Sequence, residues 1–146
     1  MKLFNQKQLA TILVVLGALP FVILTVLIIT DNSSLLLPAS PPLMLHVYGV
    51  IIASFVAGLH WGIHFCKRTS DCVYLYSSSI ALLLCCSMWA AGSMAGLALV
   101  LLGFLLLWVE EYRLSVQRVT TAWFWKLRSI VTAVVVMCMA LAVLFV

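Results

Sequence analysis

The chain has 146 residues, of which 66% are apolar and 8% are charged, and its mean hydropathy is +1.25. This composition excludes a soluble domain, because apolar surface in such excess would aggregate in water. Because the chain is so apolar, we expect the lipid bilayer as its partner. The net charge of +4 is modest, so we expect no nucleic acid as a partner.

Five apolar segments are each long enough to cross a bilayer, which takes about 20 apolar residues per helix. The sequence therefore predicts an all-α polytopic membrane protein that folds as a single integral membrane helix-bundle domain over residues 1–146. The predicted spans cover residues 9–29, 43–66, 73–91, 94–109 and 127–146.

The first span carries Pro20 near its middle. Proline removes one backbone donor and is expected to kink the helix there, which neighbouring helices can compensate. A basic start before an apolar run also resembles a signal peptide, but this run is too long and no small-residue cleavage site follows it. We therefore expect the segment to remain as the first helix, followed by a proline-containing loop over residues 30–42.

The second span is the most polar and contains all three histidines. Small residues recur at every fourth position along two rows of this span. Because such rows let helices approach closely in lipid, we expect span two to be central and to pack against at least two neighbours. The predicted packing residues are Gly49, Ala53 and Ala57 in one row and Ser54, Gly58 and Gly62 in the other.

The segment between the fourth and fifth spans, residues 110–126, places apolar side chains four, three and four positions apart. This spacing predicts a short amphipathic helix in the cytoplasmic interface. The alternative is that the fourth span continues beyond residue 109 into water. The apolar face would comprise Tyr112, Val116, Val119 and Trp123, with Trp123, Phe124 and Trp125 as an aromatic anchor at headgroup depth.

All eight lysines and arginines fall on one side of this five-span topology. Cytoplasmic loops of membrane proteins carry an excess of basic residues, so we expect a cytoplasmic N-terminus and a periplasmic C-terminus. The basic residues are Lys2 and Lys7 before span one, Lys67 and Arg68 after span two, and Arg113, Arg118, Lys126 and Arg128 after span four.

Two of the histidines, His60 and His64, are four residues apart and so share one helical face. This spacing suits two ligands of one metal ion, and a histidine could also be an axial ligand of a haem. The sequence between them lacks the glutamate of a metalloprotease helix, and no other span supplies a histidine. We therefore expect no metal site and no cofactor, and we interpret His60 as a neutral side chain hydrogen-bonded to a neighbouring helix.

Glu110 and Glu111 end span four close in depth to Arg128. They are interpreted as an ion-pair set that fixes the register of two helices, and the alternative is an anionic site for a proton or cation. No acidic residue lies at the centre of a span, which argues against an ion-coupled transporter. The candidate pocket on the cytoplasmic side comprises His60, Trp61, His64, Glu110 and Arg128.

Three stretches of the chain are distinctive when taken together: LGALPF at residues 16–21, SFVAGLHWG at 54–62 and WFWKLR at 123–128, with Tyr48 and Thr132. They resemble the membrane family known as domain of unknown function 3429, which includes transmembrane protein 69 of mitochondria. The resemblance covers most of the chain, although the family tends to have an aspartate where this chain has Glu110-Glu111 and a proline at the position of Ala122. It implies no reaction. It gives weight to Gly58, Trp61, Gly62 and Arg128 as functional positions, and it favours a bacterial or mitochondrial inner membrane.

Three functions are compatible with these features of the sequence. The first is a non-catalytic accessory or assembly partner of other inner-membrane proteins, supported by the small-residue rows. The alternative is a small-molecule, haem or lipid-binding membrane protein, or an enzyme, with a cytoplasmic-side pocket; a transporter ranks last. No catalytic motif is present, so no catalytic residue is assigned. The absence of an arginine-rich transit peptide favours the bacterial inner (plasma) membrane over the mitochondrial inner membrane.

Overall fold

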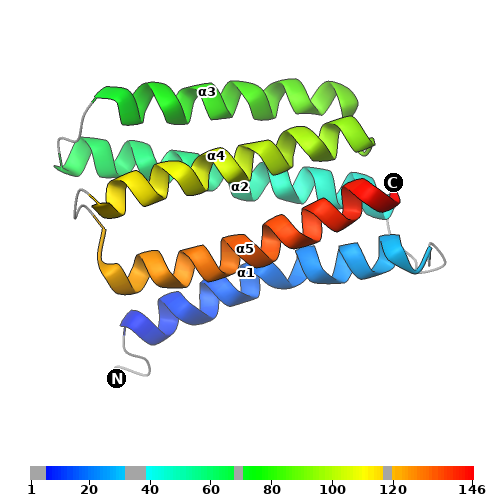
Figure 1. Ribbon diagram of the computed structural model, residues 1–146, viewed down its shortest axis with the longest axis horizontal. Coiled ribbons are helices and arrows are strands. Elements are labelled where there is room, and N and C mark those ends of the chain that lie inside the picture. Colours follow the sequence, from blue (N-terminus) through cyan, green and yellow to red (C-terminus); the bar gives the residue numbers. More distant parts are fainter. Residues whose placement is uncertain (1–5, 32–38, 68–70, 117–119) are drawn as a thin grey trace.

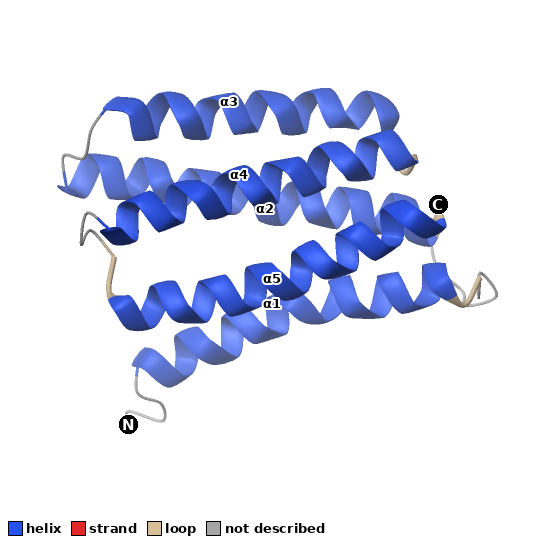
Figure 2. Ribbon diagram, viewed as in Figure 1, coloured by secondary structure: helices blue, strands red, loops and turns tan. Residues whose placement is uncertain are grey.

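The computed structural model describes residues 6–31, 39–67, 71–116 and 120–146, which fold into five long helices and one short 3-10 helix (Figures 1 and 2). The elements are α1 (Gln6–Ile29), α2 (Pro41–Lys67), α3 (Asp71–Ser87), η1 (Met88–Ala90), α4 (Met94–Val116) and α5 (Ala122–Phe145). Four of the long helices, and α3 continued by η1, are each long and apolar enough to cross a membrane. The prediction of an all-α polytopic protein with five spans is confirmed for these described segments.

The helices lie side by side, and successive helices run in opposite directions (Figure 1). Each long helix contacts the next in the chain, α5 returns to contact α1, and α2 also contacts α4 across the bundle. The start of α1 and the end of α5 lie at opposite ends of the bundle (Figure 1). The end that holds the start of α1 is called the basic end, because α1 begins there with Lys7, α2 and α4 end there and α5 starts there with Lys126 and Arg128. Lys2, Arg68 and Arg118 lie outside the described residues.

Span two is central, as predicted, since α2 contacts α1, α3 and α4. The row of Gly49, Ala53 and Ala57 is buried and faces the interior of the bundle. A Cβ atom at Gly49 would lie 2.9 Å from Cγ1 of Val100 on α4. Glycine at this position therefore allows α2 and α4 to approach closely, which is what small residues contribute in a membrane bundle.

The second row of small residues lies on the outer surface of α2. Ser54, Gly58 and Gly62 are exposed, and a Cβ atom added at either glycine would meet nothing within 4 Å. Within the described part of the chain this row packs against no other helix. The packing predicted for this row is therefore not seen among the described helices.

The helix α1 continues through Pro20 without interruption. One turn before the proline, the carbonyl oxygen of Gly17 accepts a hydrogen bond of 2.9 Å from the Tyr48 hydroxyl on α2. The Tyr48 ring also packs on Phe21, which is fully buried, with ring centroids 5.0 Å apart. A neighbouring helix thus supplies polar and apolar contacts where proline weakens the backbone ladder of α1.

The predicted interfacial helix over residues 110–126 is wrong. The helix α4 runs without a break to Val116, so span four continues beyond residue 109 as in the alternative above, and residues 122–126 already belong to α5. The physical reason is that Leu114 is 1% exposed, so the buried face of α4 continues past residue 109, and no proline or glycine interrupts residues 110–116. The aromatic residues 123–125 lie in the first turn of α5, where the Trp125 ring is 6.2 Å from that of Trp108.

At the end opposite the basic end, His46 joins three helices. It is fully buried, and its Nε2 atom lies 3.3 Å from the Ser87 hydroxyl oxygen at the end of α3. A Cβ atom at Gly96, near the start of α4, would lie 2.8 Å from His46 Nδ1 and 2.2 Å from the carbonyl oxygen of Ala90. The absence of a side chain at Gly96 therefore allows the first turn of α4 to pack directly against the His46 ring.

Candidate functional site

A cavity of about 340 Å³ lies between α1, α2, α4 and α5. Small-molecule sites in proteins commonly measure about 300–1,000 Å³ and are lined mainly by apolar side chains with a few polar groups. This cavity has that character, because Glu111, Arg128 and Thr132 are the polar or charged side chains among those that line it in the described chain. The apolar lining residues are Ala10, Leu13, Val14, Gly17, Phe21, Ile52, Phe55, Val56, Leu59, Phe104, Leu107, Trp108, Phe124, Val131 and Val135.

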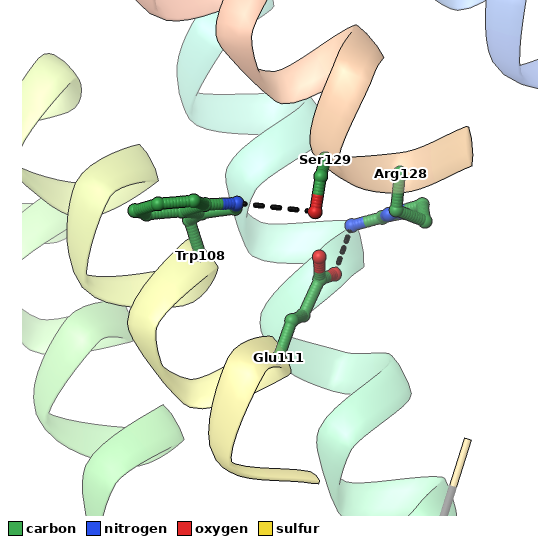
Figure 3. Close-up of polar contacts among 4 residues, drawn as sticks. All are labelled: Trp108, Glu111, Arg128 and Ser129. Carbon is green, nitrogen blue, oxygen red and sulfur yellow. Dashed lines mark hydrogen bonds and ion pairs between the residues drawn. The ribbon is translucent and has the colours of Figure 1, made fainter. Parts of the chain in front are cut away.

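An ion pair between Glu111 and Arg128 forms the polar part of the cavity wall. Arg128 Nη2 on α5 donates to Glu111 Oε1 on α4 (Figure 3), and the two side chains are only 14% and 13% exposed. One turn away, the indole Nε1 of Trp108 donates to the Ser129 hydroxyl at 3.3 Å (Figure 3). These two bonds join α4 to α5 at the basic end. The Glu111–Arg128 bond is charge-assisted and so belongs to the stronger hydrogen bonds in proteins.

A smaller cavity of about 120 Å³ adjoins the first. Leu59, Glu111, Phe124 and Arg128 line both cavities, so the ion pair lies at their junction. The smaller cavity is also lined by His60, which is 2% exposed. The other residues of its wall are Ile63, Leu114, Thr120 and Trp125.

The structure brings together two of the five residues of the predicted pocket, His60 and Arg128, which both line the smaller cavity. Trp61 and His64 lie elsewhere, against Tyr74 of α3, with ring centroids 4.0 Å and 5.9 Å from the tyrosine ring. Successive residues on a helix are rotated by about 100°, so Trp61 cannot share the direction of His60. Among the described residues, no group of three or more His, Cys, Asp or Glu side chains gathers in a way that could hold a metal ion.

The remaining predicted residue, Glu110, lines neither cavity. It is 3% exposed, and its Oε2 lies 3.7 Å from Nη1 of Arg113, one turn further along α4. The partner of Arg128 is its neighbour Glu111. The two glutamates therefore serve different contacts, although their order in the sequence makes them look equivalent.

One pattern in the sequence indicates the position of Glu111. Phe104, Leu107, Trp108 and Glu111 follow the spacing i, i+3, i+4 and i+7, which places them on one face of a helix. All four line the larger cavity. This pattern predicts that Glu111 is the charged residue at the end of an apolar helix face. Thr120 and Gly17 carry no comparable signal, because their roles depend on which helices lie next to them.

The residues to which the family resemblance gives weight lie in different places. Arg128 is in the wall of both cavities, and Trp61 packs on α3. Gly58 and Gly62 are on the outer surface of α2. The four positions therefore divide between the cavity wall, the contact of α2 with α3 and the outer surface of α2.

Comparison with known proteins gives a family and no individual relative. No curated protein and no solved structure matches the chain. One family model, described as "Protein of unknown function (DUF3429)", matches residues 6–144. This stretch takes in α1 to α4, α5 up to residue 144, and every residue that lines the two cavities. The described residues of this stretch form a bundle of five long helices that are apolar enough to cross a membrane. The chain therefore belongs to this family of proteins of unknown function.

Proposed function

We propose that this protein binds a small amphiphile, with the hydrocarbon chain between α1, α2, α4 and α5 and the polar head at the basic end. The observation that carries this proposal is the cavity of about 340 Å³ whose apolar walls end at the buried Glu111–Arg128 pair. A molecule that is apolar along its length and polar at one end has the same pattern of polarity. No catalytic residue is part of the proposal.

The size of the cavity supports an occupant. The cavity opens to the outside of the bundle, because Leu13 and Phe55 in its wall are 61% and 66% exposed, so a chain can enter it. Its volume of about 340 Å³ is far above the roughly 30 Å³ that one water takes up in the liquid. Its walls are mainly hydrocarbon, so water filling it would make few hydrogen bonds. A lipid-like chain would replace these weak contacts with dispersion contacts along four helices.

Filling the cavity from the protein side is expected to displace the ligand. Gly17 lines the larger cavity, and a Cβ atom there meets nothing within 4 Å, so Gly17→Leu places a new side chain in the space of the bound chain. Forcing atoms into occupied volume costs about 1–3 kcal/mol, which corresponds to about tenfold weaker binding. Native mass spectrometry of the protein purified in mild detergent measures the fraction that retains a small amphiphile.

The matched control is Gly58→Leu. It is the same substitution in another helix, also with no atom within 4 Å of the added Cβ, and Gly58 lines neither cavity. The proposal expects Gly58→Leu to retain ligand as the wild type does. Equal retention by the wild type and Gly17→Leu, or no retained amphiphile in any of the three proteins, would contradict it.

A second candidate function is an accessory or assembly partner of other membrane proteins. It is supported by the outward row of Ser54, Gly58 and Gly62, which packs against nothing within the described chain. Small residues at every fourth position allow a helix of another protein to approach closely in lipid. On this proposal Gly58→Leu abolishes the co-purification of partner subunits on blue-native gels, whereas Gly17→Leu leaves it intact. Migration of the wild type as an isolated monomer at native abundance would count against it.

We further propose that the protein lies in a bacterial inner membrane with its basic end in the cytoplasm, the mitochondrial inner membrane being the alternative. The positive-inside rule supports this orientation, since the described lysines and arginines share one end of the bundle. A topology reporter fused after Val146 is expected to be active only on the periplasmic side, and one inserted after Lys67 only in the cytoplasm. The reverse pattern would show that the amphiphile head is placed on the other face of the membrane.

A further inference from the structure

The polar end of the site contains more hydrogen-bonding capacity than the described protein uses. Three atoms of residues that line the smaller cavity are buried and have no hydrogen-bond partner among the described residues. They are His60 Nδ1, Glu111 Oε2 and Thr120 Oγ1. Leaving a buried polar group unpaired costs about 1–3 kcal/mol, so three of them around one cavity call for an occupant that can bond to them.

The three atoms restrict the chemistry of that occupant. Glu111 is paired with Arg128 through Oε1, so its Oε2 is a carboxylate oxygen that can only accept a hydrogen bond. The occupant must therefore donate. The Thr120 hydroxyl can donate or accept, and His60 Nδ1 does one or the other according to its tautomer. A hydroxyl group, which donates once and accepts twice, matches this set.

The charge of the site restricts it further. Glu111 and Arg128 neutralise each other, and no other charged side chain among the described residues lines either cavity. Within the described part of the chain, a carboxylate, phosphate or ammonium head would find no further counter-ion, and an unpaired buried charge is far more costly than an unpaired neutral group. The head that fits this described lining is neutral.

We propose that the ligand head is a neutral hydroxyl group, as in a long-chain alcohol, which occupies the smaller cavity and donates to Glu111 Oε2. The position of this cavity supports the assignment. It meets the larger one at the ion pair, so a hydroxyl there would sit at the end of a chain lying between the helices. This inference rests on the proposed function, because it takes the larger cavity as the place of the hydrocarbon chain.

Four probes that share one oleyl or oleoyl chain separate the head from the chain. Oleyl alcohol is neutral and donates a hydrogen bond, methyl oleate is neutral and cannot donate, oleate is anionic and oleylamine is cationic at neutral pH. Binding is measured in nanodiscs of fixed lipid composition. Each unlabelled probe competes with a tritiated tracer, in one series tritiated oleyl alcohol and in a second series tritiated methyl oleate. A hydrogen bond to a charged group contributes about 1.5–3 kcal/mol, so oleyl alcohol is expected to bind at least about tenfold more tightly than each of the other three.

The outcomes distinguish this inference from the proposed function. Binding of none of the four probes overturns both. Equal binding of all four, or tightest binding of methyl oleate, overturns the head assignment and leaves a chain-binding cavity. Tightest binding of oleate or oleylamine also overturns it, since the head would then be charged.

A variant of the cavity wall provides a test at the level of one atom. Thr120→Val removes a buried hydroxyl of the smaller cavity with almost no change in shape and leaves the Glu111–Arg128 pair in place. It is expected to reduce the preference for oleyl alcohol over methyl oleate by about threefold, as for the loss of one neutral hydrogen bond. The control is Thr121→Val, the same substitution at the next residue, which is exposed and lines neither cavity. A preference unchanged in Thr120→Val would contradict the placement of the hydroxyl in this cavity.

Discussion

Replacing Arg128 with methionine is expected to destabilise the protein by about 3–5 kcal/mol, the cost of removing one partner of a buried ion pair. Arg128 is the partner of Glu111, and both side chains are about seven-eighths buried. Methionine keeps much of the apolar stem of arginine but leaves the carboxylate without its cation. The reversible unfolding of the protein in mixed detergent micelles, followed by circular dichroism, measures the change.

Two variants show whether the ion pair is the cause. Lys126→Met removes a charge from the same turn of α5, but Lys126 is exposed and lines neither cavity, so its effect should stay within about 0.5 kcal/mol. The double variant Arg128→Met with Glu111→Leu removes both charges, and apolar replacement of a buried pair is often neutral or stabilising. It should therefore recover most of the lost stability. A double variant as unstable as Arg128→Met alone would show that lost packing, not the unpaired carboxylate, is responsible.

Gly96→Ala is expected to destabilise the protein by about 2–3 kcal/mol, at the upper part of the range for overpacking a close contact. The added methyl group would lie 2.2 Å from the carbonyl oxygen of Ala90 and 2.8 Å from the ring of His46. The first contact is with backbone, so the start of α4 must move away from η1. His46 would then lose its position beside Ser87.

The control for this prediction is Gly62→Ala on the outer surface of α2. A Cβ atom there meets nothing within 4 Å, and alanine in a helix is favoured over glycine by about 0.4–1 kcal/mol through the entropy of the unfolded chain. The same substitution should thus have opposite signs at the two positions. Thermal denaturation of both variants in one detergent gives the comparison, and equal destabilisation would mean that contact with Ala90 and His46 is not the cause.

The five spans could be predicted because the properties that define them are local. A bilayer requires about 20 apolar residues per helix, and this is visible in any stretch of sequence without knowledge of its neighbours. The distribution of lysine and arginine is likewise a property of the chain read in order, and it correctly grouped the described basic residues at one end of the bundle. The predicted end of span four at residue 109 was wrong, since α4 continues to Val116. Amphipathic spacing over residues 110–126 does not reveal that Leu114 is buried in the bundle.

The composition of the site depended on how the helices are rotated and paired. In sequence, Glu110 and Glu111 are equivalent candidates for pairing with Arg128, yet a rotation of about 100° between successive residues directs one to Arg113 and the other to Arg128. The same rotation separates His60 from Trp61. The two rows of small residues on α2 have the same spacing, but only one of them is buried in the described bundle. The order of residues along the chain thus specified the crossings and the charged end, since hydrophobic length and charge are properties of single segments. The cavity, the ion pair and the open face of α2 arose only when the helices packed together, because each is formed by side chains from different segments.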